Sequence, residues 1–232
     1  MASIVLETRN LTRVFGGLTA VDHVDFALPK GQIHALIGPN GAGKSTFVGM
    51  VAGRIPRTRG EVWFEGEDVT ELPAHRRIRR GMAYTFQITA IFSRLTLFDN
   101  VALALRTRTP RKVLAALDIV GLADRARQIS GDLSYGHQRL LEIAMGVAQA
   151  PRLLILDEPT QGLAESEVED FNALIRRLSV DTTILLIEHN MPVVMALADA
   201  ITVLETGRVL ASGAPAQIQA DPLVQEAYLG IA

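Results

Sequence analysis

The chain has 232 residues, of which 48% are hydrophobic, and a formal net charge of −2 at pH 7. This length suits one large domain, or a domain with an inserted subdomain, and the hydrophobic fraction is ample for a core. The near-neutral charge argues against a general nucleic-acid binder, and the lack of cysteine excludes disulfides and thiolate metal sites. We expect no membrane-spanning helix, because no run of about 18 apolar residues is present.

The first part of the chain carries strand signals separated by turns. Val24, Phe26 and Leu28 alternate with polar or small residues before a Pro-Lys-Gly turn, and residues 61–66 predict another short strand. Phe15 lies ahead of them in a Phe-Gly-Gly sequence. Its ring could stack on a nucleobase, as aromatic side chains do, or pack in a core, and the residue alone does not decide between the two.

Residues 38–45 read Gly-Pro-Asn-Gly-Ala-Gly-Lys-Ser and fit the phosphate-binding pattern G-x-x-x-x-G-K-[ST]. Glycines let the backbone turn tightly, so that several N–H groups can point at one phosphate. Lys44 adds a positive charge near the β- and γ-phosphates, and the Ser45 hydroxyl can hold Mg²⁺. The flanking residues predict a buried strand before the loop, at 32–37, and a helix after it, at 45–52. This order places phosphate at a helix N-terminus.

The pattern becomes helical between about Thr96 and Gly121. Apolar residues recur there at three- and four-residue spacing, in two sets that Thr107-Arg108-Thr109-Pro110 separates: Leu97, Val101 and Leu105, then Val113, Leu117 and Val120. A helical block between β-rich parts predicts an inserted helical subdomain. We place this subdomain at residues 87–133, and the core with its β subdomain at residues 1–86 and 134–232.

The sequence Leu133-Ser134-Tyr135-Gly136-His137-Gln138 leads into a run with helical spacing. Ser134 is a good N-cap. A hydroxyl beside a glycine at a helix start can also bind an anion. Taken alone, however, this stretch is better explained as a plain capped helix.

Two apolar runs end in polar residues at 153–158 and 182–189. Both suit buried parallel strands, and open α/β sheets bind ligands at the carboxyl edge of such strands. Asp157 is placed to hold Mg²⁺, and Glu158 to orient and deprotonate an attacking water, although paired acids at a strand end also occur in simple turns. A neutral His189 can form a hydrogen bond at a γ-phosphate.

The order of these motifs resembles the ATP-binding subunit of an ABC transporter over nearly the full length of the chain. The resemblance implies an α/β P-loop NTPase core of ABC type, with an antiparallel β subdomain and an inserted helical subdomain.

Near the C-terminus, the local sequence pattern predicts a hairpin at residues 201–211 and a short helix at residues 221–229.

The resemblance also implies that the chain binds ATP with Mg²⁺ and hydrolyses it. It gives catalytic roles to Lys44, Gln87, Glu158 and His189. It assigns Mg²⁺ binding to Ser45, Gln87 and Asp157. The nucleotide would contact the adenine-stacking aromatic residue, the Walker A loop and, in the opposite subunit, the signature motif: Phe15; Gly38, Pro39, Asn40, Gly41, Ala42, Gly43, Lys44, Ser45 and Thr46; Ser134, Tyr135 and Gly136.

Among ABC proteins the chain looks most like the Liv-type group, which imports branched-chain amino acids and related amides. The cues are local: Phe15-Gly16-Gly17-Leu18, Leu133 to Gly136, Ile187-Glu188-His189-Asn190-Met191 and Glu226-Ala227-Tyr228-Leu229-Gly230. ATPases for urea, for aromatic acids or for lipopolysaccharide export share much of this sequence and stay as alternatives. Two residues depart from the family pattern: His137 replaces the usual Gln, and Ala164 replaces an Asp that many members carry. The helical block is also short for this group.

The resemblance implies several partners. These are a second ATP-binding subunit, identical or paralogous, two transmembrane permease subunits and, indirectly, a periplasmic or extracellular solute-binding protein. No nucleic acid is expected. The protein would lie on the cytoplasmic face of the plasma membrane as a peripheral subunit.

Two rival functions are less favoured. A soluble ABC protein of translation or DNA repair would carry two cassettes or a long coiled coil, whereas this chain has one phosphate loop and no extended heptads. A small-molecule kinase with a phosphate loop would lack the motifs at Gln87 and at Ser134 to Gly136.

Overall fold

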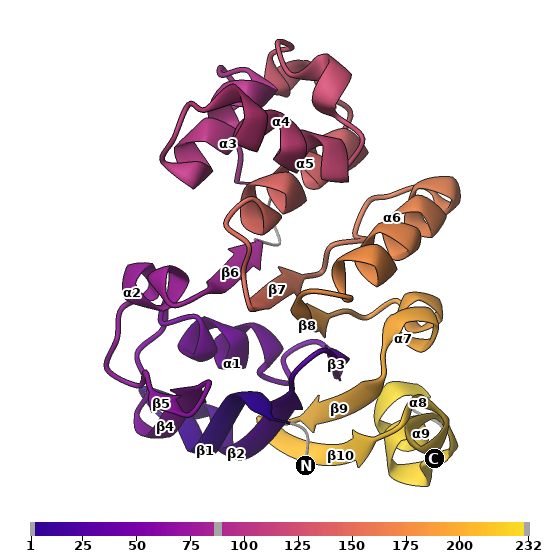
Figure 1. Ribbon diagram of the computed structural model, residues 1–232. Coiled ribbons are helices and arrows are strands. Elements are labelled where there is room, and N and C mark those ends of the chain that lie inside the picture. Colours follow the sequence, from indigo (N-terminus) through magenta and orange to yellow (C-terminus); the bar gives the residue numbers. More distant parts are fainter. Residues whose placement is uncertain (1–2, 86–89, 230–232) are drawn as a thin grey trace.

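The computed structural model describes residues 3–85 and 90–229 as two β-sheets with surrounding helices (Figure 1). The first sheet is antiparallel and has the strand order β2-β1-β4-β5. Its strands are β1 (Ile4–Phe15), β2 (Leu18–Pro29), β4 (Arg59–Phe64) and β5 (Glu67–Asp68). The alternation predicted in β2 is confirmed, because Val24, Phe26 and Leu28 are all buried.

The second sheet has the strand order β10-β9-β3-β8-β7-β6. Its strands are β3 (Ile33–Ile37), β6 (Met82–Thr85), β7 (Leu153–Asp157), β8 (Thr183–Ile187), β9 (Ala200–Glu205) and β10 (Arg208–Gly213). Neighbours from β9 to β6 pair in parallel, and β10 closes one edge as the antiparallel partner of β9. Every residue of β3, β7 and β8 is buried, as expected for parallel strands covered on both faces. The predicted hairpin at 201–211 is confirmed.

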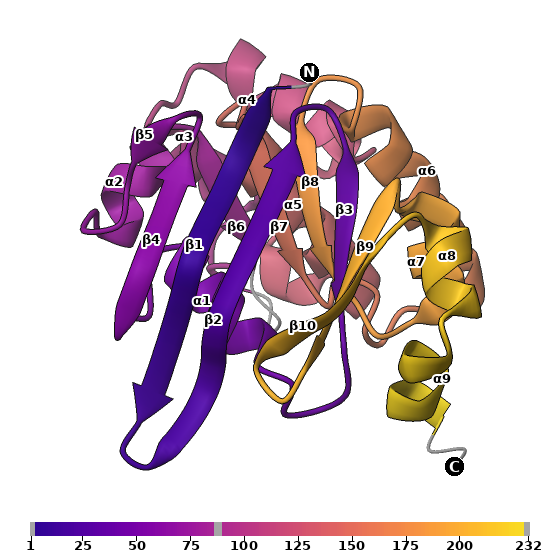
Figure 2. The same ribbon diagram turned by 90° about the horizontal axis from the view of Figure 1, so that it is seen from below.

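One helix lies between the two sheets. This helix, α1 (Lys44–Val51), contributes Phe47 to a core cluster that also holds Leu6 of the first sheet and Ile155 of the second. Figure 2, seen from below, shows the long β1–β2 pair crossing in front of α1. The phosphate-loop helix is therefore packed against both sheets.

The remaining helices of the core are α2 (Ala74–Arg79), α6 (Glu165–Leu178), α7 (Met191–Leu197), α8 (Pro215–Ala220) and α9 (Pro222–Leu229). The long helix α6 is amphipathic and buries Phe171, Leu174 and Ile175 at three- and four-residue spacing. The short C-terminal helix predicted from residue 221 is confirmed by α9. In the part of the chain that the structure describes, no helix combines the length and the hydropathy that crossing a bilayer requires.

A block of helices follows β6 and precedes β7. It contains α3 (Leu97–Leu105), α4 (Pro110–Ile119), the single 3₁₀ turns Ala123–Arg125 and Ser130–Asp132, and α5 (Tyr135–Val147). Figure 1 shows this block on the far side of β6 and β7 from the first sheet. The predicted apolar residues Leu97, Val101, Val113, Leu117 and Val120 are buried within it, whereas Leu105 is only partly buried. The division of the chain at residues 87 and 133 stays a prediction.

Candidate functional site

Glycines shape the turn between β3 and α1. A Cβ atom at Gly38 would overlap the carbonyl oxygen of Leu204, and one at Gly43, whose φ is +97°, would overlap that of Ala20. Neither position admits a side chain, so only glycine allows the loop to pack this closely on its neighbours. The first N–H groups of a helix have no intrahelical partner, and Gly43, the N-cap of α1, brings no side chain to satisfy them. Such a helix start binds anions.

Lys44 begins α1 and folds back over this loop. Its Nζ donates hydrogen bonds to the carbonyl oxygens of Gly38, at 2.6 Å, and Pro39, at 3.1 Å. Burial lowers the pKa of Lys44, and the nearby charges of Glu158 and Asp157 oppose that shift. The ammonium group is thus held near both the loop and the acid pair, where it can meet a phosphate.

The other predicted loop residues differ in exposure. Those open to solvent are Asn40, Gly41 and Ser45; Pro39, Gly43 and Thr46 are half-buried, and Gly38 and Ala42 are buried. The Ser45 hydroxyl and the Asp157 carboxylate supply oxygen donors, which Mg²⁺ prefers. Across residues 3–85 and 90–229, no group of three or more His, Cys, Asp or Glu forms a self-contained metal site. This donor set fits an ion that shares its coordination with substrate phosphates.

Asp157 ends β7 and is buried. Tyr84 on the neighbouring strand β6 donates its hydroxyl to Asp157 Oδ2 at 2.5 Å, and the Arg54 guanidinium lies 4.8 Å from the centre of the Tyr84 ring. Burial raises the pKa of the Asp157 carboxyl, the Tyr84 hydrogen bond lowers it, and the charge of Glu158 raises it. Tyr84 therefore favours the ionised form of Asp157.

Glu158 follows in the left-handed backbone region, with a φ of 46°. This conformation is uncommon for a residue with a side chain and tends to occur at functional sites. The Oε1 atom of Glu158 lies 3.8 Å from Nδ1 of His189, whose side chain is exposed beyond β8. The structure thus brings Lys44, Asp157, Glu158 and His189 together at the carboxyl ends of three adjacent strands, β3, β8 and β7.

Ser134 is the N-cap of α5 and is exposed. Its Oγ accepts the backbone N–H of His137 at 3.4 Å and lies 2.7 Å from His137 Nδ1. Helix α5 packs on α3, α4 and β6, whereas α1 lies against β1 and β2. Helix α5, which follows Ser134 and begins at Tyr135, therefore lies in the helical block, away from α1 (Figure 1).

Phe15 ends β1 and is 43% exposed, so it is not a core residue. The Arg13 guanidinium lies 4.3 Å from the centre of the Phe15 ring, an arrangement that holds an aromatic side chain at the surface. An exposed ring is available for stacking on a base. Gln87 lies outside the described residues.

Comparisons with known proteins converge on one family. The family model for ABC transporters matches residues 21–161, and the model for branched-chain amino acid ATP-binding cassette transporters matches residues 208–232. The high-affinity branched-chain amino acid transport ATP-binding protein BraF of Pseudomonas aeruginosa is 38% identical over 253 aligned residues, covering 99% of each chain. The chain belongs to the branched-chain amino acid (Liv) family of ABC transporter ATP-binding proteins.

Two further proteins resemble the chain over nearly its whole length. LivG of Escherichia coli K12, a high-affinity branched-chain amino acid transport ATP-binding protein, is 36% identical over 253 aligned residues and 99% of each chain. The solved ADP conformation of MJ1267, an ATP-binding cassette of an ABC transporter, has a TM-score of 0.88 at 27% identity, covering 98% of this chain and 99% of that one. The predicted family and fold class of the cassette are confirmed.

Tyr84 and Glu188 belong to the site of this ABC cassette but have no predicted role. Tyr84 acts across strands, and no local pattern marks its contact with Asp157. Glu188 directly follows the apolar run Ile184–Ile187 of strand β8 and precedes His189. A charged residue that directly follows such a run is the signal that could have identified it, because a buried carboxylate needs several donors.

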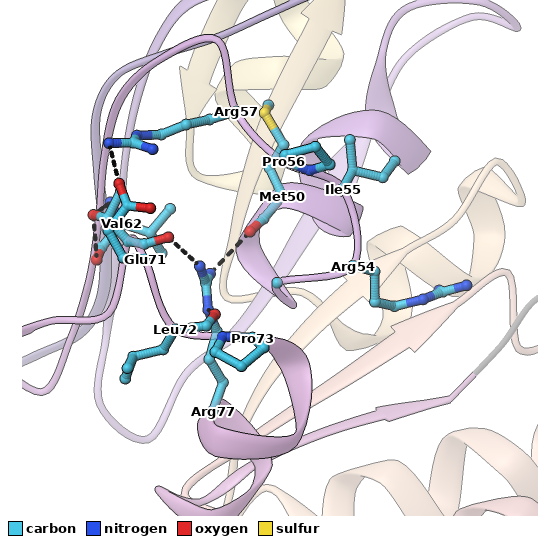
Figure 3. Close-up of a pocket in the computed structure, with 12 residues that line it drawn as sticks. Met50, Arg54, Ile55, Pro56, Arg57, Val62, Glu71, Leu72, Pro73 and Arg77 are labelled. Carbon is cyan, nitrogen blue, oxygen red and sulfur yellow. Dashed lines mark hydrogen bonds and ion pairs between the residues drawn. The ribbon is translucent and has the colours of Figure 1, made fainter.

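A pocket of about 220 Å³ lies at the other end of α1 in the cassette (Figure 3). Arg77 lines this pocket and donates to the last carbonyls of α1, those of Met50 at 2.9 Å and Val51 at 2.6 Å. It also donates to the carbonyls of Leu72 and Thr70, each at 2.8 Å. Burial lowers the pKa of Arg77 to about 10, so it stays charged at neutral pH. A cation at this end stabilises the helix that carries the phosphate loop.

We expect Tyr84→Phe to move the acid limb of the ATPase pH profile to higher pH. The variant loses only the hydroxyl, and with it the hydrogen bond that lowers the pKa of Asp157. Since burial already raises this pKa, the carboxyl should then become protonated at a higher pH than in the native protein. The measurement is kcat/KM for MgATP across the pH range. An acid limb that coincides with that of the native protein would exclude this role for Tyr84.

Proposed function

We propose that this ABC ATPase drives the import of branched-chain amino acids or related amides. The reaction rests on one observation, the convergence of Lys44, Asp157, Glu158 and His189 beside the glycine-rich loop that leads into α1. The solute class rests on the similarity to BraF and LivG, both named as branched-chain amino acid transport proteins.

In the proposed mechanism the protein contributes positioning and charge, which is what phosphoryl transfer needs. The N–H groups that begin α1 and the Lys44 ammonium hold the β- and γ-phosphates. Glu158 aligns the attacking water and accepts its proton, while His189 forms a hydrogen bond at the γ-phosphate. Ser45 and Asp157, with Gln87, would hold Mg²⁺, which neutralises phosphate charge when bound.

The signature residues Ser134, Tyr135 and Gly136 act, in this proposal, on nucleotide held by a second ATP-binding subunit. The exposure of Ser134 and Tyr135 at the start of α5, and the position of α5 in the helical block away from α1, support this role. The second subunit is either another copy or a paralogue. Two such chains would enclose two ATP molecules, with the adenine of each against Phe15.

Two transmembrane permease subunits would dock where the helical block meets the core. A hollow of about 130 Å³ lies there, lined by residues of α2, β6, α3 and α5 that include Ile78, Ala83, Ala104 and Met145. Phe92, just before α3, is 55% exposed. Exposed apolar side chains of this kind fit a protein-binding surface. The chain would then be peripheral on the cytoplasmic face of the plasma membrane, with a solute-binding protein acting from the other side.

We expect Phe92→Ser to uncouple transport from ATP hydrolysis, and Leu95→Ser, at a half-buried position, to act in the same direction. The backbone of Phe92 is held by Asn100, through bonds of 2.8 Å and 3.2 Å, so the Phe92 variant should keep its local structure. Solute uptake should fall while basal ATPase activity is retained. Leu223→Ser is the matched control, because Leu223 is 57% exposed on the distant helix α9. Equal uptake by the Phe92 and Leu223 variants would exclude docking at this surface.

Reconstitution tests the proposed function directly. The chain is purified with the permeases encoded beside its gene and placed in liposomes with the matching solute-binding protein. ATP-dependent uptake of labelled leucine that requires this chain supports the proposal. Uptake of urea or of an aromatic acid in place of leucine would overturn the solute class. Failure to associate with any permease would overturn the transport role.

A further inference from the structure

Glu188 is a carboxylate buried behind the candidate site, with an exposed fraction of 0%. Its Oε1 accepts the backbone N–H of Thr160 at 3.0 Å and the Thr160 hydroxyl at 2.5 Å. Its Oε2 accepts the backbone N–H groups of His189, at 3.0 Å, and Asn190, at 3.2 Å. Each oxygen therefore serves a different loop. One loop follows β7 and carries Glu158, and the other follows β8 and carries His189.

We propose that Glu188 is a positioning residue that holds the loops of Glu158 and His189 in one fixed relation. The strand ends are already joined, because the N–H of Glu158 donates to the carbonyl of Ile187 at 2.9 Å. Glu188 fixes the chain beyond those ends, where the reacting side chains are attached. The inference rests on the proposed function, in which Glu158 aligns the water and His189 contacts the γ-phosphate.

The chemistry of the four donors explains why a carboxylate is required. Three of them are backbone N–H groups, which can only donate, and a carboxylate can accept from both loops at once. Hydrogen bonds to a charged acceptor are stronger than those to a neutral one. A glutamine of the same size would offer its oxygen to one loop and its NH₂ group to the other, where it would meet a backbone N–H. One loop would then be released.

The first experiment is the kinetics of Glu188→Gln in the full chain. We expect kcat for ATP hydrolysis to fall about 10- to 100-fold, as for the loss of one hydrogen bond to a charged group. The KM for MgATP should stay within about 2-fold, because the phosphate loop keeps its contacts. Unchanged kcat, or a loss confined to KM, would overturn the proposal.

A double-mutant cycle separates positioning from general structural damage. If Glu188 acts through the catalytic loops, Glu188→Gln should cost less further activity in a chain that already carries His189→Ala than it costs the native chain. A fully additive loss would overturn the proposal. Single-turnover assays keep the slow variants measurable.

A milder variant keeps the test valid if Glu188→Gln does not fold. Thr160→Val removes only the hydroxyl arm, so kcat should fall less and the cycle with His189→Ala should again be non-additive. Thr202→Val is the matched control, since Thr202 is also a buried hydroxyl but bonds His34, at 2.8 Å. Equal activity of the Thr160 and Thr202 variants would contradict the positioning role of Glu188.

Variants of Glu158 and His189 test the proposed catalytic roles separately from the positioning role of Glu188. If Glu158→Gln and His189→Ala retain native turnover, the proposed roles of those residues fail. If both lose turnover while Glu188→Gln and Thr160→Val do not, only the positioning role fails.

Discussion

Glu158→Gln is expected to stop ATP turnover while leaving ATP bound. Glutamine keeps the size and one oxygen acceptor but removes the base, so product formation should fall by about 10²- to 10⁴-fold, the usual contribution of general acid–base catalysis. Asp157 keeps its hydrogen bond from Tyr84, at 2.5 Å, so the metal and the phosphates should still bind. The measurements are the rate of phosphate release and the affinity for ATP with Mg²⁺. Near-native turnover would remove Glu158 from the role of base.

The same variant reports on the second subunit. With hydrolysis blocked, ATP should hold two chains together through Ser134 and Gly136 of each opposing copy. Size-exclusion chromatography with ATP and Mg²⁺, beside the same protein with ADP, should show a dimer only with ATP. An inactive variant that stays monomeric would exclude a homodimer, and adding a paralogue would then test a mixed dimer. The control is Glu165→Gln, which changes an exposed acid in the first turn of α6 and should leave turnover and the response to ATP as in the native protein.

Lys44→Ala should weaken ATP binding and abolish hydrolysis together. In the native chain the Lys44 ammonium is buried over the loop and held by two carbonyl oxygens, at 2.6 Å and 3.1 Å. Its removal leaves the N–H groups of α1 as anion donors but deletes the main side-chain charge toward the phosphates. Nucleotide affinity and turnover are measured beside Lys30→Ala, which changes an exposed lysine. Unchanged turnover in Lys44→Ala would place the phosphates elsewhere.

Much of the candidate site was predictable because its residues sit in local patterns. Gly38 to Ser45 form a continuous motif, and Asp157 and His189 end or follow apolar strands, so the rule for carboxyl ends of parallel strands applies. The strand order could not be read from the sequence in the same way. It depends on pairing between segments far apart in the chain, such as β3 with β8, and no local signal specifies that choice.

The residues that sequence reasoning missed act through such distant pairings. Tyr84 reaches Asp157 only because β6 lies next to β7. In the sequence Glu188 is only the residue after an apolar strand, and its contact with Thr160 becomes visible only in the folded chain. For Phe15 the sequence left two readings open, and exposure at the end of β1 excludes the core position. Contacts across the fold, rather than residue type, decide each case.

The pairing of β3 also has a consequence for biosynthesis. Both neighbours of this strand, β8 and β9, come much later in the chain, at Thr183–Ile187 and Ala200–Glu205. At about 5–20 residues per second, a ribosome needs roughly ten to thirty seconds to produce them after β3. During that time β1, β2 and β4 can pair locally, but the apolar β3 has no partner on either edge. Open strand edges of this kind favour aggregation, so nascent chains should depend on chaperones until β9 has emerged.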